Sequence, residues 1–176
     1  NGNVTASGYG TVNLISSFIS SISNISGNLR MNVYDCEVTN AFSIDNGAVK
    51  GCTILGGLTI NNDGGAIGDT IRIMGNHIEN GLTWSSSYAY FEICNNYIEN
   101  ITNTSQTYGI YVTGLQSTPG GTNLISNNTI IASGYYTSSN SYYYPHGIYF
   151  TGMSNGQNLV IANNYINVVS TYQNSY

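Results

Sequence analysis

A six-residue pattern recurs along this chain, and no other feature of the sequence limits the fold as strongly. Every copy begins and ends with Val, Ile or Leu, and the full copies carry Asn, Asp, Gly or Cys at the two central positions. Asn and Gly tolerate left-handed backbone angles, so the central pair predicts a tight bend between two short apolar segments. The copies span 33–38, 49–54, 73–78, 93–98, 125–130 and 161–166, with a degenerate one at 14–19.

A second pattern accompanies the first and consists of a small residue, an apolar residue, a polar residue or Tyr, and another apolar residue. This alternation has a period of two, which is typical of a strand with one buried and one exposed face. Its copies span 41–44, 57–60, 81–84, 109–112 and 147–150.

Short strands joined by a repeated bend can bury their aliphatic residues by stacking coil upon coil. The sequence therefore predicts an all-β fold, a right-handed parallel β-helix of about seven coils, in a single domain over 1–176. The coils are expected over roughly 11–168, with outward loops near 61–70, 115–122 and 133–146. An antiparallel β-sandwich suits the strand spacing, but its strands seldom repeat one bend motif. A left-handed β-helix favours shorter and more uniform coils.

The Asn-Asn-x-Ile and Gly-Ile-Tyr phrases resemble those of the right-handed parallel β-helix, or pectin-lyase-like, superfamily. The resemblance covers roughly residues 11 to 168 and concerns the scaffold. In that family, stacked Asn side chains at the bend form a hydrogen-bonded ladder. The resemblance implies such a ladder here, at Asn76, Asn96, Asn128 and Asn164.

Cys36 and Cys52 occupy the ladder position in two adjacent coils. Stacked strands lie ~4.8 Å apart, which is within the Cα separation that a disulfide accepts. The pair could therefore form a disulfide, or continue the ladder as buried thiols. Cys94 holds the second position of its copy, where we expect an outward side chain.

Charge is scarce, because only 6% of the residues are charged and Lys and Arg together number 3. A nucleic-acid or anionic-membrane surface needs clustered basic residues, so both partner classes are excluded. No apolar run is long enough to span a bilayer. From Asn100 onward the chain carries no charged residue.

Equivalent positions in adjacent coils bring some of these charges together. Arg72 and Glu92 are expected to form a surface salt bridge worth little. Glu79 and Glu99 are also equivalent and would repel each other or share a cation. With His77 on the same face, they are the candidate catalytic residues, since paired carboxylates serve retaining glycosidases.

The enzymatic interpretation is nevertheless disfavoured. The lyases of the resembling family combine Ca²⁺-binding acids with Arg or Lys, and its polygalacturonases carry an Arg-x-Lys motif that is missing here. Asp63 and Asp69 flank a Gly-Gly loop that could hold Ca²⁺, but a turn explains them equally well. We therefore expect no catalytic residue, no metal and no cofactor.

Tyrosines and sequons suggest a different role. Tyr111 and Tyr149 should stack outward on successive coils, and a nearby loop in the sequence is rich in Tyr. Rings of this kind suit glycan or protein contacts. The loop residues are Tyr142, Tyr143 and Tyr144. Asn-x-Ser/Thr sequons, the acceptors of N-glycosylation, support an extracellular or cell-surface location. They begin at Asn3, Asn24, Asn100, Asn103 and Asn127.

Neither end of the repeat carries a capping signal, and uncapped solenoid ends favour head-to-tail stacking. The leading hypothesis is a secreted structural or adhesive protein that pairs with itself and forms an extracellular fibre or surface layer. A polysaccharide-active enzyme or its inactive remnant is one alternative. A glycan-binding or tail-fibre module is the other.

Overall fold

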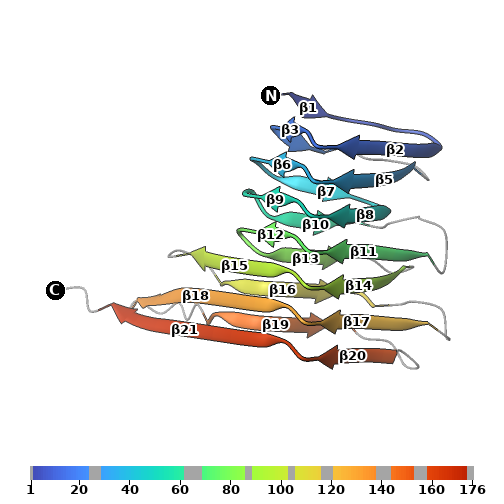
Figure 1. The fold of residues 1–176 in the computed structure, drawn as a ribbon. Coiled ribbons are helices and arrows are strands. Elements are labelled where there is room, and N and C mark those ends of the chain that lie inside the picture. Colours follow the sequence, from blue (N-terminus) through green and yellow to red (C-terminus); the bar gives the residue numbers. More distant parts are fainter. Residues whose placement is uncertain are drawn as a thin grey trace.

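The computed structural model describes residues 2–23, 29–61, 69–85, 89–102, 106–115, 121–137, 144–152 and 158–173. For residues 102, 135–137 and 171–173 it describes the backbone alone. These residues form a right-handed parallel β-helix of 21 strands in three sheets of seven, and no helix occurs among them. Seven coils stack along one axis, with the first and the last described strands at opposite ends of the stack (Figure 1).

Each coil contributes one strand to each sheet. The first sheet contains β1 (Asn3–Val4), β4 (Ser21–Ile22), β7 (Phe42–Ile44), β10 (Leu58–Ile60), β13 (Leu82–Ser85), β16 (Tyr108–Thr113) and β19 (His146–Thr151). The second contains β2 (Gly10–Ile15), β5 (Leu29–Tyr34), β8 (Gly47–Lys50), β11 (Thr70–Met74), β14 (Tyr90–Cys94), β17 (Thr122–Ser126) and β20 (Asn158–Ala162). The third contains β3 (Phe18–Ile19), β6 (Glu37–Val38), β9 (Thr53–Ile54), β12 (His77–Ile78), β15 (Tyr97–Thr102), β18 (Thr129–Thr137) and β21 (Tyr165–Gln173).

The predicted repeats supply the register of these sheets. The six-residue pattern forms the end of a second-sheet strand, the bend, and the start of a third-sheet strand, while the second pattern forms the first sheet. One predicted loop boundary is wrong, because β18 continues to Thr137 and the excursion expected over 133–146 starts later. Residues 133–137 extend the strand by pairing with β21 (Figure 1).

The core consists of aliphatic columns that run parallel to the solenoid axis. Every inward position of the third sheet just after the bend is Ile or Val, in register from coil to coil. Burying an aliphatic side chain of this size contributes roughly 1.5–3 kcal/mol. The column reads Ile19, Val38, Ile54, Ile78, Ile98, Ile130 and Ile166.

The bend owes its shape to one left-handed residue per coil. The third position of every copy has a positive φ, between 48° at Ser16 and 66° at Gly51 and Gly75. Asn, Asp and Gly adopt this conformation with the least strain, which explains their recurrence there. The other four are Asp35, Asn95, Asn127 and Asn163.

The residue after this bend forms the ladder implied by the resemblance. The Asn96 Oδ1 accepts hydrogen bonds from the Asn76 backbone N–H at 3.0 Å and from its Nδ2 at 2.9 Å. Asn128 and Asn164 repeat both bonds in the next coils. Each Nδ2 also donates to a carbonyl oxygen of the second sheet, so a row of buried amides is satisfied without water.

Cys36 and Cys52 continue the ladder position as buried free thiols. The Cys52 backbone N–H donates to the Asn76 Oδ1 at 2.9 Å, which ties the thiols to the amides. The Cys36 thiol donates to the Tyr34 carbonyl oxygen at 3.2 Å, and the Cys52 thiol donates to that of Lys50 at 3.3 Å. Each thiol is thus directed to backbone oxygen, and the disulfide that the spacing permits is not formed here.

Cys94 faces outward as predicted, in the same column as Lys50 and Met74 of the preceding coils. It is buried, although it does not belong to the aliphatic core, and its Sγ accepts a hydrogen bond from the Ser126 hydroxyl at 3.3 Å. The two residues are paired on β14 and β17, so the next coil covers the thiol.

Candidate functional site

Three features stand out on the exterior of the solenoid, two groups of side chains and one pocket. The first is a carboxylate–histidine cluster, His77, Glu79 and Glu99, on the outer face of the third sheet. The second is an aromatic array, Tyr108, Tyr111, His146 and Tyr149, on the first sheet. The third is an open pocket near the N-terminal end.

The carboxylate–histidine cluster spans the fourth and fifth coils. One ligand atom from each of the three residues lies within 4.8 Å of the others, and the His77 Nε2 is 3.8 Å from the Glu99 Oε1. His77 is paired with Tyr97 on the next strand, and the two rings meet edge to face with centroids 5.0 Å apart. The structure therefore brings together the three residues that sequence spacing singled out.

Tyr97 links the members of this cluster. Its hydroxyl donates to the Glu99 Oε2 at 3.2 Å, while its ring contacts His77. Desolvation and then the Glu99 carboxylate raise the pKa of Tyr97, so the phenol stays protonated and keeps donating at neutral pH. Sequence reasoning overlooked Tyr97, although its register with His77 follows from the six-residue repeat.

The aromatic array is a two-by-two group of rings on β16 and β19. Tyr111 and Tyr149 are in register, as predicted, with centroids 5.7 Å apart, and Tyr108 stacks on His146 at 5.2 Å. Tyr108 also stacks on Tyr111 at 4.6 Å within its own strand. Burial, and then the two neighbouring tyrosines, raise the pKa of Tyr108.

The array depends on two glycines. Each lies between an outward ring and an inward Ile, in the phrases Tyr108-Gly-Ile-Tyr111 and His146-Gly-Ile-Tyr149. Gly109 and Gly147 face the interior, and a Cβ on Gly109 would lie 2.7 Å from the Gly147 carbonyl oxygen. Aligning the two phrases would have placed Tyr108 over His146, a pairing that the predicted contact surface did not include.

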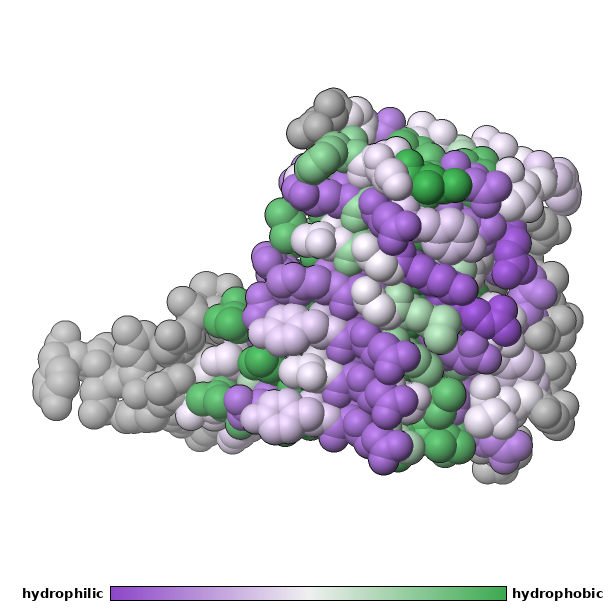
Figure 2. Space-filling view, viewed as in Figure 1, coloured by the Kyte–Doolittle hydropathy of each residue, from purple (hydrophilic) through white to green (hydrophobic). Residues whose placement is uncertain are grey.

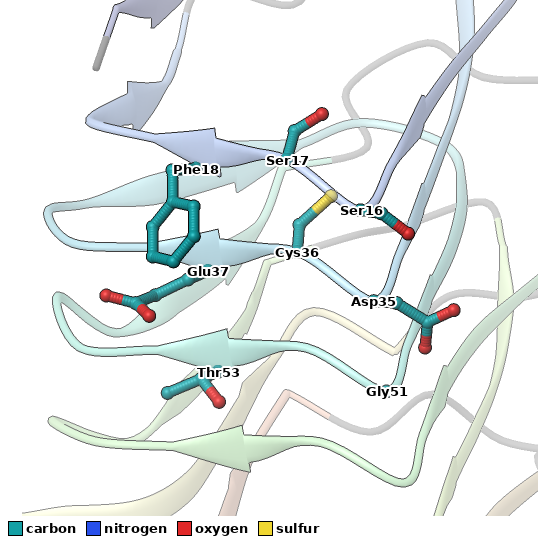
Figure 3. A pocket seen from close by; sticks show the side chains of 8 residues that line it. All are labelled: Ser16, Ser17, Phe18, Asp35, Cys36, Glu37, Gly51 and Thr53. Carbon is teal, nitrogen blue, oxygen red and sulfur yellow. The ribbon is translucent and has the colours of Figure 1, made fainter.

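The open pocket has a volume of about 300 Å³ and lies at the bends of the first three coils. Figure 3 shows Phe18, Glu37 and Thr53 pointing outward from successive strands along one side of it. Its lining combines two carboxylates and several hydroxyls with the Phe18 ring and the edge of one thiol: Ser16, Ser17, Phe18, Asp35, Cys36, Glu37, Gly51 and Thr53.

The remaining predicted sites have mixed outcomes. Arg72 and Glu92 form the expected ion pair, with the Arg72 Nε 2.8 Å from the Glu92 Oε2. Asp69 lies 3.9 Å from the Arg30 guanidinium and accepts a hydrogen bond from Asn46 at 2.9 Å, while Asp63 lies outside the described residues.

Among the sequon asparagines that the structure describes, Asn3 and Asn127 are exposed. Asn100 is half-buried, and its Nδ2 donates to the Tyr108 carbonyl oxygen at 2.8 Å, so the acceptor nitrogen is engaged. Asn24 and Asn103 lie outside the described residues. Of the Tyr-rich loop, Tyr144 is described and exposed, and Tyr142 and Tyr143 are not described.

Comparison with protein-family models, with curated proteins and with solved structures finds no match for this chain. The described residues include no helix that is long and apolar enough to cross a membrane. The face of the solenoid in Figure 2 is mostly hydrophilic or neutral, with hydrophobic residues in small separate groups.

Proposed function

We propose that this chain is a structural β-solenoid that works outside the cell and assembles head to tail into a fibre or surface layer. One observation carries the proposal: core positions that the second to sixth coils bury are exposed in the last described coil. Ile161, whose column is buried from Val33 to Ile125, is 48% exposed. Ile166 and Val168, which also continue inward columns, are exposed as well.

The register indicates which surface could cover this coil. Two inward columns of the last coil have aliphatic counterparts in the first coil, Leu14 on β2 for Ile161 and Ile19 on β3 for Ile166. A second copy placed head to tail would set its Leu14 over Ile161 and its Ile19 over Ile166. All three sheets would then continue with parallel pairing.

The outer column of the third sheet and the bend also have complementary residues in the first and last coils. Phe18 begins the outer column of the third sheet with 68% of its surface exposed, and Tyr165 ends it with 62% exposed. Head-to-tail stacking would place these two rings together. It would also place the hydroxyl of Ser17, the first residue at the ladder position, next to the backbone N–H of Asn164.

Scarce charge and exposed sequons at Asn3 and Asn127 support an extracellular setting. The amide ladder supports a relation to the pectin-lyase-like superfamily, which we infer for the scaffold alone. An enzymatic role has weaker support. The side chains of His77, Glu79 and Glu99 lie on the outer face of a sheet, whereas the pocket of Figure 3 is lined by other residues.

The experiment compares two lysine variants on the same strand. Ile161→Lys puts a charge in the proposed contact, whereas Val160→Lys, whose side chain is 44% exposed, puts it on the outer face of the solenoid. Electron microscopy and analytical ultracentrifugation over a range of concentrations should show fibres for the parent chain and for Val160→Lys. Ile161→Lys should remain monomeric, with the circular dichroism spectrum of the parent.

Uniform monomers of the parent chain at every concentration would contradict the proposal. If the two variants assembled equally well, the contact between copies would have to lie elsewhere than on the end coil.

The aromatic array favours glycan binding as a second function. Its rings are half-exposed and already packed against one another, so a sugar face can be bound at little entropic cost. Polysaccharide pull-down tests this function. Tyr111→Ala should lose binding that the parent chain retains, and Thr59→Ala, in the same outer column two coils away, should keep it.

A further inference from the structure

The carboxylate–histidine cluster has donor atoms from two coils held at a fixed spacing. His77 and Glu79 come from the fourth coil and Glu99 from the fifth, and hydrogen bonds pair the strands β12 and β15 that carry them. The backbone N–H of Tyr97 donates to the Asn76 carbonyl oxygen at 2.8 Å, which ties the coils together beside the cluster. The spacing of the three donors is therefore a property of the scaffold.

The charge of this cluster is not balanced by Lys or Arg. The chain has 3 basic residues, and all of them are described. Arg30 lies beside Asp69, Arg72 pairs with Glu92, and Lys50 lies 6.0 Å from the centre of the Tyr34 ring. Two carboxylates thus share one face with a single imidazole, an arrangement that a bound cation would stabilise.

Tyr97 orients two of the three donors. It donates a hydrogen bond to the Glu99 Oε2, which leaves the Oε1 directed at His77, and its ring restricts the imidazole through an edge-to-face contact. Removing a group that holds a metal ligand in place through such contacts typically weakens metal affinity 10–100-fold.

From this geometry we propose that His77, Glu79 and Glu99 bind a divalent transition-metal cation of the Zn²⁺ type. One imidazole nitrogen and two carboxylates suit Zn²⁺, Co²⁺ or Ni²⁺, whereas Ca²⁺ takes six to eight oxygen ligands. Donors about 2.0–2.2 Å from a tetrahedral Zn²⁺ lie roughly 3.3 Å apart. The separation of 3.8 Å between the His77 and Glu99 atoms closes to this value with small side-chain rotations. Water would complete the coordination at this exposed face.

The bound ion would join the fourth coil to the fifth. It would therefore stabilise the fold, in proportion to the logarithm of the metal concentration above the dissociation constant. This effect provides a measurement that does not depend on any activity.

The test uses Co²⁺ as a spectroscopic substitute for Zn²⁺. We expect one Co²⁺ per chain, visible as d–d absorption without a thiolate charge-transfer band, and a rise in the thermal midpoint on addition of the metal. His77→Ala and Glu99→Gln should each weaken Co²⁺ binding at least tenfold and remove most of the rise. Glu37→Gln, which removes the same charge from the same outer face, should change neither.

Absence of Co²⁺ binding by the parent chain up to millimolar concentration would overturn the proposal. If Glu37→Gln and Glu99→Gln weakened Co²⁺ binding equally, the ion would be held by general electrostatic attraction rather than at a specific site. A thiolate band would assign the ion to the cysteines instead.

Discussion

At the scale of single residues, the bend separates two tasks that adjacent positions perform. The third position of the repeat supplies a left-handed backbone, and the fourth supplies an amide that bonds to the coils on both sides. The first task needs conformational freedom, and the second needs a specific set of donors and acceptors. Asn95 and Asn96 perform them side by side with the same residue type.

Asn96 lets these two tasks be distinguished. Asn96→Ala should cost about 3 kcal/mol, because it leaves the buried Asn76 backbone N–H without its partner and removes a hydrogen bond to the Ile73 carbonyl oxygen. Asn95→Gly should be nearly neutral, since Gly accepts the φ of 57° at this exposed site. Urea denaturation followed by the fluorescence of the buried Trp84 measures both. Equal losses in the two variants would mean that the ladder contributes little.

The Cys52 thiol gives the bend a pH dependence. Burial is the main cause that raises the pKa of Cys52 from 9.0 to about 11. The thiol thus favours the folded state below pH 9, and this contribution is lost as the pH rises towards 11, because the unfolded chain releases the proton first. In Cys52→Ala, the denaturation midpoint should fall less steeply above pH 9 than in the parent. Parallel curves would show that Cys52 has an ordinary pKa.

At the scale of strands, the sequence predicted the features that lie at repeated positions and missed those that lie outside the repeats. The aliphatic columns could be predicted because every coil repeats Val, Ile or Leu at the same place, and the resemblance implied the ladder in the four coils that carry Asn at the fourth position. The end of β18 could not, because the pairing of Ser133 with Val169 joins two segments outside any repeated motif. The outward position of Cys94 was inferred from strand alternation, which does not show that Ser126 would cover the thiol.

The two sites were predicted to different extents. His77, Glu79 and Glu99 could be grouped from spacing alone, because their coils are joined without long insertions. Tyr108 and His146 could have been paired in the same way, by aligning Tyr108-Gly-Ile-Tyr111 with His146-Gly-Ile-Tyr149, but the predicted contact surface took only Tyr111 and Tyr149 from these phrases. Their distances and ring angles depend on side-chain packing, which no residue pattern specifies.

The strand β16 contains the most restrictive glycine of the aromatic array. Gly109→Ala should displace β16 from β19, because its Cβ would overlap the Ile130 side chain and lie 2.7 Å from the Gly147 carbonyl oxygen. We expect a loss of about 2–3 kcal/mol, typical of overpacking, and a weaker tyrosine signal in the near-ultraviolet circular dichroism spectrum. Gly2→Ala is the matched control, since its Cβ meets nothing within 4 Å. An unchanged spectrum in Gly109→Ala would show that the array tolerates a larger residue there.

At the scale of the whole molecule, the charges are confined to the middle of the solenoid. All Asp, Glu, Lys and Arg residues lie between Arg30 and Glu99, so the described strands of the first and last coils carry none of these four residue types. A head-to-tail contact would therefore be apolar and hydrogen-bonded, whereas contact between the sides of two solenoids would involve the charged coils. The two modes of association differ in their response to salt.

This difference leads to a prediction about fibre growth. Raising the ionic strength from about 20 mM to about 500 mM shortens the Debye length several-fold and would strongly alter a contact made by charged groups. If growth occurs through the end coils, the critical concentration should change less than about twofold, with a slight decrease as the net charge of −5 is screened. Sedimentation of assembled material at each salt concentration measures it. Fibres that dissolve in salt would place the contact on the charged middle coils, and would separate lateral association from the end-to-end mode that the exposed Ile161 column favours.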